Sequence, residues 1–268
     1  MNNNEYLDLG KVTLIDSFIS EKTLSERISI SSKDNSLNFN LFANLIQKPV
    51  GYDEFSKYKG FHITFETLRE HLGFEKNKKP GDFDILLIPF SDEKIYFERC
   101  CAIEIKVVRP NRKNPKKAPN SYGIKQINGL IKDGFPLIGL IHICMTEPLK
   151  ENEKQTIKLD LTPFDMDNPA NNDKFMESTI NVKYDHFSQY SAENQMKKLL
   201  SKDIPKYIGL ITVGVNLTDK GKLLTSFNHD FNNGYSSGYF NPYKKLETIN
   251  KIESFFTENK DKFQIAKK

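Results

Sequence analysis

The sequence contains little cysteine and no tryptophan, and the scarcity of cysteine removes two classes of protein. Its three cysteines are Cys100, Cys101 and Cys144, and no Cys-x-x-Cys pair occurs. A disulfide-stapled scaffold needs an even set of spaced cysteines, and a cysteine-rich zinc site needs closely spaced pairs. Neither class fits this chain.

Long apolar runs are also absent. No segment reaches the roughly 18 consecutive apolar residues that a membrane-spanning helix needs. Residues 1–9 show no basic stretch followed by an apolar core, so we expect no signal peptide. These absences predict a cytoplasmic protein with no membrane partner.

Several catalytic motifs are missing. There is no phosphate-binding Gly-x-x-x-x-Gly-Lys-Ser/Thr loop and no His-x-x-x-His pair, which disfavours a built-in nucleotide motor and a zinc hydrolase. The segment 234–238 fits Gly-x-Ser-x-Gly, the serine-hydrolase turn. That turn needs a preceding strand, a following helix and a later histidine, whereas a polar loop precedes Ser236 and no histidine follows it. We interpret the match as accidental, and a small-molecule enzyme has no other support.

The residues that are present suit a folded chain with a sizeable core. Hydrophobic residues make up 38% and aromatics 12% of the 268 residues, which excludes global disorder. We expect a single domain over 1–268, with the core motifs in about 62–145 and elaborations at both ends. The net charge is 39 − 35 = +4, so any nucleic-acid site must come from local charge.

Hydrophobic periodicity predicts an α/β fold. Helical spacing occurs in 62–74, 121–133, 192–201 and 242–259. Extended patterns occur in 82–90, 95–108, 136–144, 156–161 and 207–215. Two of these strands, 136–144 and 207–215, are apolar along most of their length, as is typical of strands buried on both faces. The order of elements predicts a central mixed β-sheet flanked by helices.

Charged residues lie where two of these strands would pair. Asp84 is near the start of 82–90, and Glu104 and Lys106 are near the end of 95–108. Residues i and i+2 of a strand share a face, so antiparallel pairing would put Asp84 beside Glu104, with Lys106 on the same side. Two adjacent carboxylates repel unless positive charge lies between them. Oxygen ligands suit Mg²⁺, and Lys106 would then orient or activate water.

The segment Pro80-Gly81-Asp82-Phe83-Asp84, followed by Glu104-Ile105-Lys106, resembles the PD-(D/E)xK nuclease superfamily. The resemblance covers about 62–145 and implies a restriction-endonuclease-like core. It further implies a phosphodiesterase that cuts DNA or RNA with Mg²⁺ or Mn²⁺. Asp84 and Glu104 match the metal ligands of the superfamily, with the backbone carbonyl of Ile105 as a further ligand, and Lys106 matches its active-site lysine.

The resemblance extends to residues around this core. Gln126, on the following helix, matches a polar residue that would position water or phosphate. Glu66 or Glu70, on the predicted preceding helix, matches an additional acidic ligand of some members. Gly81 departs from the shortest family pattern, because it separates Pro80 from Asp82. That departure favours Asp84 over Asp82 as the principal ligand.

A basic loop follows the second strand. Within 109–120 there is no acidic residue, and the cations are Arg109, Arg112, Lys113, Lys116 and Lys117. Such a loop beside the acidic site would hold a nucleic-acid backbone by neutralising phosphate charge. A solvated loop with no binding role remains the alternative.

Together these features predict a metal-dependent DNA endonuclease in restriction or anti-phage defence. A homodimer would place two sites on a duplex, and any ATP-driven step would need a separate helicase or ATPase subunit. The alternative from another class is a non-catalytic nucleic-acid-binding or assembly subunit that retains the nuclease fold. Such a subunit would bind DNA without metal, and its binding would not depend on Glu104. A purely structural alternative for the motif is an ion pair between Glu104 and Lys106 on an exposed strand face.

Overall fold

The computed structural model describes residues 6–7, 46, 49–75, 82–117, 122–160, 179–217, 223–226, 235–236 and 238–267. The chain forms two compact units. One contains Met1–Glu147 and Ser188–Lys268, and the other is Pro148–Phe187. The single domain expected from the sequence stays a prediction.

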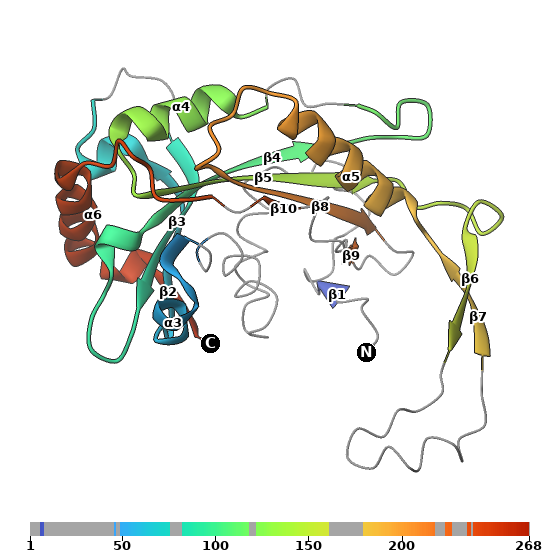
Figure 1. The fold of residues 1–268 in the computed structure, drawn as a ribbon, viewed down its shortest axis with the longest axis horizontal. Coiled ribbons are helices and arrows are strands. Elements are labelled where there is room, and N and C mark those ends of the chain that lie inside the picture. The colour runs from blue at the N-terminus through green and yellow to red at the C-terminus, as the bar shows by residue number, and fades with distance from the viewer. Residues whose placement is uncertain are drawn as a thin grey trace, which may run out of the picture. The chain divides into compact units, whose positions relative to one another are not determined.

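The larger unit is built on a mixed sheet. Nine strands of its described residues pair in the order β1-β9-β8-β5-β4-β3-β2-β11, with β10 beside β8 (Figure 1). Their bounds are Tyr6–Leu7 (β1), Gly60–Leu68 (β2), Asp82–Phe90 (β3), Cys101–Val108 (β4), Leu137–Thr146 (β5), Gly209–Leu217 (β8), Leu223–Ser226 (β9), Tyr235–Ser236 (β10) and Gln264–Lys267 (β11). Strands β2, β3 and β4 are antiparallel, and β4, β5 and β8 are parallel. The predicted mixed α/β sheet is therefore confirmed.

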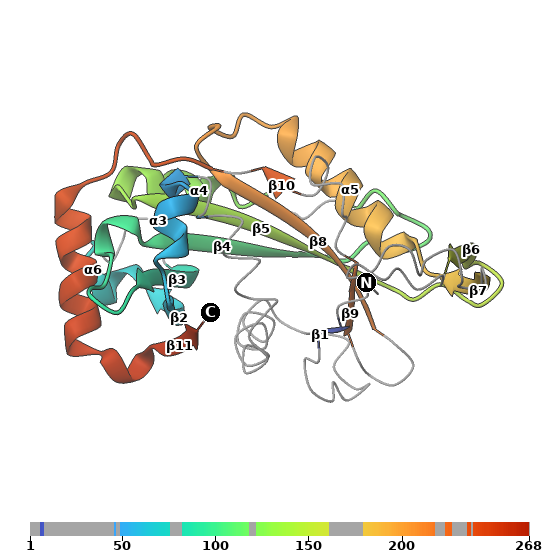
Figure 2. The ribbon, with the colours of Figure 1, turned by 60° about the horizontal axis from the view of Figure 1, so that its bottom comes forward.

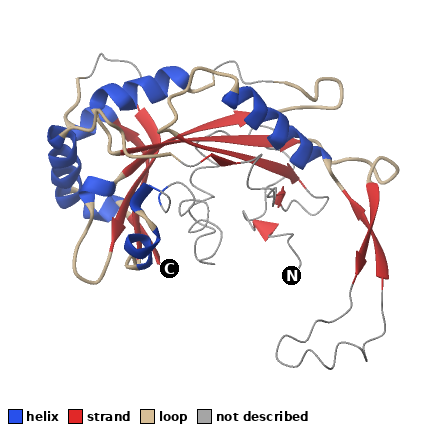
Figure 3. Cartoon of the chain, viewed as in Figure 1, coloured by secondary structure: helices blue, strands red, loops and turns tan. Residues whose placement is uncertain are grey.

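Helices flank this sheet (Figure 3). The α-helices are α3 (Tyr52–Ser56), α4 (Ile124–Asp133), α5 (Phe187–Leu200) and α6 (Leu246–Glu258), and the 3₁₀ helices are η2 (Arg69–Leu72), η3 (Phe97–Arg99) and η5 (Lys260–Lys262). A parallel pair needs a crossover connection, and α4 supplies the one between β4 and β5. None of the helices in the described ranges is long and apolar enough to cross a membrane.

Side chains alternate between the two faces of the sheet, and both faces are buried. Ile85 and Leu87 point to one face, where they pack with Phe55 and Tyr58 from α3 and the turn after it. Leu86 points to the opposite face, which α4, α5 and α6 cover (Figures 1 and 2). We call this second side the helical face. Burial on both faces explains why β5 is almost entirely apolar.

The three cysteines belong to this buried sheet. Cys100, Cys101 and Cys144 are free thiols with at most 1% of their surface exposed. Burial raises the pKa of each thiol, that of Cys144 to about 12.

The helix predicted over 62–74 is wrong. Gly60–Leu68 forms strand β2, and only Arg69–Leu72 is helical. The β-branched residues Ile63, Thr64 and Thr67 favour extended backbone, and β2 is held between β3 and β11 by antiparallel pairing. The helical spacing of the large apolar residues in this segment was a coincidence.

The strand predicted over 95–108 begins later than expected. Phe97–Arg99 forms 3₁₀ helix η3, and the strand proper is Cys101–Val108. The 3₁₀ turn contains Arg99, which binds Glu54 at 2.7 Å and the Tyr58 hydroxyl at 2.9 Å. Contacts with a distant segment therefore decide the local structure here.

The smaller unit, Pro148–Phe187, contains an antiparallel pair of strands. They are β6 (Gln155–Asp160) and β7 (Thr179–Tyr184). After β7, the Asp185 carboxylate accepts hydrogen bonds from the backbone N–H groups of Leu149 (2.7 Å) and Phe187 (3.0 Å). These bonds join the two ends of the unit.

Candidate active site

Asp84 and Glu104 lie opposite each other on neighbouring strands. Ile85 pairs with Ile103 across β3 and β4, and continuing that antiparallel register by one residue sets Asp84 against Glu104. Both carboxylates are on the helical face and both are buried, at 9% and 3% exposure. One Asp84 oxygen, Oδ2, accepts a hydrogen bond from the backbone N–H of Ile105. The antiparallel pairing predicted from the sequence is confirmed.

Lys106 lies two residues beyond Glu104 and forms an ion pair with it. Its Nζ is 2.7 Å from Oε1 of Glu104, and the two side chains are only 12% and 4% exposed. Such a buried pair costs desolvation energy, so it is weak evidence of a purely stabilising role. Buried ionisable groups gathered at one place are instead typical of functional sites.

Burial and neighbouring carboxylates disfavour the charged form of Asp84. Burial first, and then the charge of Glu104, raises the pKa of Asp84 to about 8. The Ile105 N–H and the Lys106 ammonium act in the opposite direction but do not compensate, and the charge of Glu66 adds to the rise. A cation between the carboxylates would relieve this repulsion.

The oxygen donors fit a hard divalent cation. Among the described residues, no group of three His, Cys, Asp or Glu side chains has the geometry of a metal site. Two carboxylates, assisted by a backbone carbonyl and water, are nevertheless a usual donor set for Mg²⁺, which retains several waters. Asp84 and Glu104 would hold the ion. The backbone carbonyl of Ile105 would be the further ligand that the resemblance to the nuclease superfamily implies. When bound, the ion would supply positive charge beside a substrate phosphate.

Glu66 is the additional acid that the structure brings to this site. The register of β2 with β3 sets Glu66 opposite Asp84. Its backbone φ is 47°, a left-handed value that is uncommon outside glycine and interrupts the ladder here. The sequence placed Glu66 on a helix, but it lies in β2. Asp82 is exposed at the start of β3, and Glu70 lies beyond β2 in η2.

The first turn of α4 begins over Glu104 and Lys106. Gly123 precedes the helix with φ 75°, and a Cβ there would lie 3.4 Å from Cγ of Glu104 and 3.6 Å from Cγ of Lys106. Gln126 belongs to this first turn. Its side-chain Oε1 is buried and has no hydrogen-bond partner in the part of the chain that the structure describes. The start of a helix also favours anions such as phosphate.

Replacing Gly123 by alanine is expected to destabilise the protein by about 2–4 kcal/mol, because of the left-handed backbone and the contact with the Leu140 side chain at 2.8 Å. Thermal or denaturant unfolding measures the change. Gly73→Ala is the control, since Gly73 has φ 78° but its Cβ would meet only Lys251, at 3.9 Å. We expect it to cost about 1 kcal/mol. Equal costs at the two positions would contradict the close approach at Gly123.

Sequence reasoning missed a polar bridge next to Lys106. His142, opposite Lys106 in β5, is fully buried. Its Nδ1 is 2.9 Å from Nε2 of Gln195 in α5, and its Nε2 is 3.3 Å from the Tyr122 carbonyl oxygen. Burial lowers the pKa of His142 to about 4, so the ring is neutral: it accepts from Gln195 and donates to Tyr122.

The bridge fixes the segment that leads into α4. The signal in the sequence was a histidine inside the apolar run 136–144, because a buried polar side chain needs partners. Nothing in the sequence identified those partners, which lie 20 and 53 residues away.

The basic loop follows β4 directly, as expected. The side chain of Lys198 in α5 donates hydrogen bonds to the backbone carbonyl oxygens of Lys116 and Lys117, the latter at 3.4 Å. The loop is therefore tied to α5. Pro80, Gly81 and residues 118–121 lie outside the described residues.

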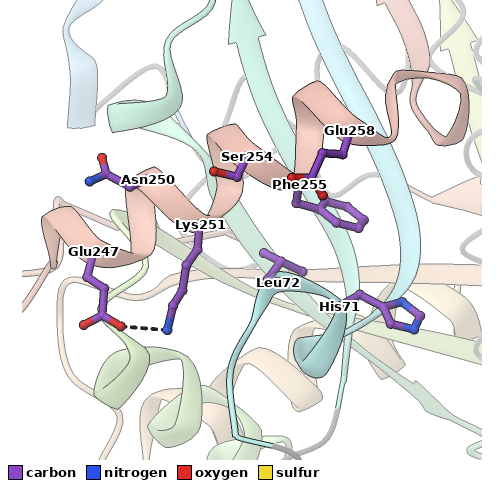
Figure 4. A pocket seen from close by; sticks show the side chains of 8 residues that line it. All are labelled: His71, Leu72, Glu247, Asn250, Lys251, Ser254, Phe255 and Glu258. Atoms are coloured by element: carbon purple, nitrogen blue, oxygen red, sulfur yellow. Dashed lines mark ion pairs between the residues drawn. The ribbon is translucent and has the colours of Figure 1, made fainter.

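A separate hollow of about 360 Å³ lies between η2 and α6 (Figure 4). Its lining includes His71 and Leu72 on one side, and Asn250 and Ser254 on the other. An ion pair of 2.7 Å between Glu247 and Lys251 crosses one end of it. None of the predicted site residues lines this hollow.

Comparisons with protein-family models, with curated proteins and with solved structures find no match for this chain. The grounds for assigning a function are therefore the arrangement of Asp84, Glu104 and Lys106, their electrostatics, and the resemblance of their motif.

Proposed function

We propose that this chain is a metal-dependent nuclease that hydrolyses phosphodiester bonds of nucleic acid. The observation that carries the proposal is the facing pair Asp84 and Glu104, with Lys106 at 2.7 Å from Glu104. DNA is the proposed substrate, cut internally, in restriction or anti-phage defence.

The residues divide into three roles. Asp84 and Glu104 hold Mg²⁺ or Mn²⁺, and Glu66 adds negative charge that strengthens cation binding. Lys106 orients the attacking water, helps to remove its proton and stabilises charge on the phosphate. Gln126, whose buried oxygen lacks a partner among the described residues, positions water or phosphate.

The surroundings support a nucleic-acid substrate. Five cations of the basic loop follow the strand that carries Glu104 and Lys106, and neutralisation of phosphates is the main source of affinity for nucleic acids. A homodimer would supply the second site for a double-strand cut. A helicase or ATPase subunit remains a proposed partner, because the sequence has no phosphate-binding loop of its own.

The test is incubation of the purified protein with plasmid, linear DNA and single-stranded RNA, in Mg²⁺, Mn²⁺ or EDTA. Glu104→Ala is assayed beside the wild type. We expect cleavage that needs the metal and disappears in the variant, with plasmid nicking or linearisation as the sign of internal cutting. Metal-independent binding without cleavage, unchanged in Glu104→Ala, would instead identify a non-catalytic binding subunit.

A further inference from the structure

A line of contacts connects the basic loop to the start of α4. It begins where Lys198 binds the carbonyl oxygens of Lys116 and Lys117. Lys202 follows four residues later, in the turn that ends α5. The loop and the end of α5 therefore present their cations together.

Lys202 brings this line close to the candidate site. Its Nζ lies 4.6 Å from the centre of the Tyr122 ring, a cation–π contact. Tyr122 is followed by Gly123, the residue that approaches Glu104 and Lys106. Lys202 therefore contacts the residue immediately before Gly123, which lies next to Glu104 and Lys106.

Among the described residues, no acidic side chain pairs with the lysines of the loop or of the end of α5. None of Lys113, Lys116, Lys117, Lys198 and Lys202 forms an ion pair in the part of the chain that the structure describes, whereas Lys57, Lys59, Lys94 and Lys251 all do. The Lys116 ammonium is also close enough to Lys198 to lower its pKa, in addition to the effect of burial. Like charges held together without counterions are typical of a surface that binds a polyanion.

We propose that Lys116, Lys117, Lys198 and Lys202 form one phosphate-binding surface, the lysine ridge. It holds the backbone of the nucleic acid and leads it to Glu104 and Lys106. This inference rests on the proposed nuclease function and adds α5 to the substrate-binding residues, through Lys198 and Lys202. A nucleic-acid strand is favoured because it is a continuous row of phosphates. The ridge offers it cations at the loop and, through Lys202, beside Tyr122 at the start of α4.

Salt-dependent binding of a labelled duplex of about 30 base pairs, measured by anisotropy in EDTA, tests the ridge. The variants are Lys198→Ala/Lys202→Ala and Lys202→Ala alone. The second keeps the Lys198 hydrogen bonds to the loop. We expect Kd at about 0.1 M salt to rise roughly tenfold or more in the double variant and severalfold in the single one. The slope of log Kd against log salt should fall by about one for each phosphate that the variant no longer neutralises.

Lys260→Ala/Lys262→Ala is the matched control. It removes the same charge from η5, beside the β11 end of the sheet. Both lysines lie over aromatic rings, at 6.0 and 5.9 Å, as Lys202 does at 4.6 Å. We expect little change in Kd for this variant. Equal weakening in both double variants would overturn the ridge, because only net charge would then matter. Unchanged binding in the ridge variants would overturn it too.

Cleavage kinetics separate the ridge from the proposed function. In the ridge variants KM should rise with kcat nearly unchanged, since these lysines bind substrate without touching the scissile bond. A wild type that binds but never cuts would refute the nuclease function, and the binding comparison would still decide the ridge. A wild type that binds neither DNA nor RNA would refute both.

Discussion

Lys106→Met is expected to lower kcat by about a thousandfold or more at saturating Mg²⁺, while the protein still binds the metal. The variant would lack both proposed functions of the lysine, which are proton transfer from water and stabilisation of charge on the phosphate. Methionine keeps most of the length of the side chain, so the packing beneath Gly123 is retained. Plasmid cleavage gives kcat, and titration calorimetry with Mg²⁺ gives metal affinity.

Lys251→Met is the control for Lys106→Met. Lys251 also forms a 2.7 Å ion pair, with Glu247, but in the hollow beside α6, away from the candidate site. We expect its kcat to stay within about twofold of the wild type. If kcat of Lys106→Met stays within tenfold of the wild-type value, the catalytic role of Lys106 is refuted. Its buried ion pair with Glu104 is then only structural.

Asp84→Asn is expected to stabilise the metal-free protein. In the presence of Mg²⁺ the same variant is expected to be inactive. The ordinary carboxyl pKa of 3.8 is raised to about 8 by burial and by Glu104. The ionised form is therefore disfavoured in the folded state at neutral pH. Asparagine removes that charge, keeps an oxygen to accept from the Ile105 N–H and adds a donor toward Glu104. We expect a gain of about 1–3 kcal/mol at pH 7.5 in EDTA.

The raised pKa of Asp84 determines how the stability of the protein changes with pH. A carboxyl whose folded-state pKa is raised stabilises the fold below its unfolded pKa, and that contribution disappears as pH rises through the folded value. The stability of the wild type relative to Asp84→Asn should therefore decline between about pH 4 and pH 8. His142 titrates over part of this range, but it is common to both proteins and cancels in the difference.

Chemical denaturation at several pH values, with and without Mg²⁺, measures these effects. Mg²⁺ should stabilise the wild type by mass action and leave Asp84→Asn nearly unchanged. Asp82→Asn is the control, since Asp82 is exposed two residues away in the same strand, and we expect it to behave as the wild type. A loss of metal-free stability in Asp84→Asn would show that the carboxylate charge is already compensated without a cation.

The hairpin that carries the candidate site was largely predictable from the sequence. Successive side chains of the strands predicted over 82–90 and 95–108 point to opposite faces, and antiparallel pairing then brings Asp84 to Glu104. Apolar patterning also predicted the buried strands β5 and β8, because burial on both faces leaves a run with few polar residues.

The rest depended on contacts between distant segments. Glu66 looked helical because the apolar residues Phe65, Leu68 and Leu72 around it recur at helical spacing. Pairing with β3 instead imposes an extended strand with one left-handed residue. The partners of His142 and the contact of Lys202 with Tyr122 arise from the packing of α5 on the sheet. No local pattern contains that information.

The burial of all three thiols has a consequence for chemical labelling. Cys100, Cys101 and Cys144 lie in or next to adjacent central strands with raised pKa values, and reagents attack only an accessible thiolate. The native protein should therefore resist alkylation until the central sheet opens. A cysteine introduced at an exposed position would then be the one site that a fluorophore modifies, without removal of the natural thiols.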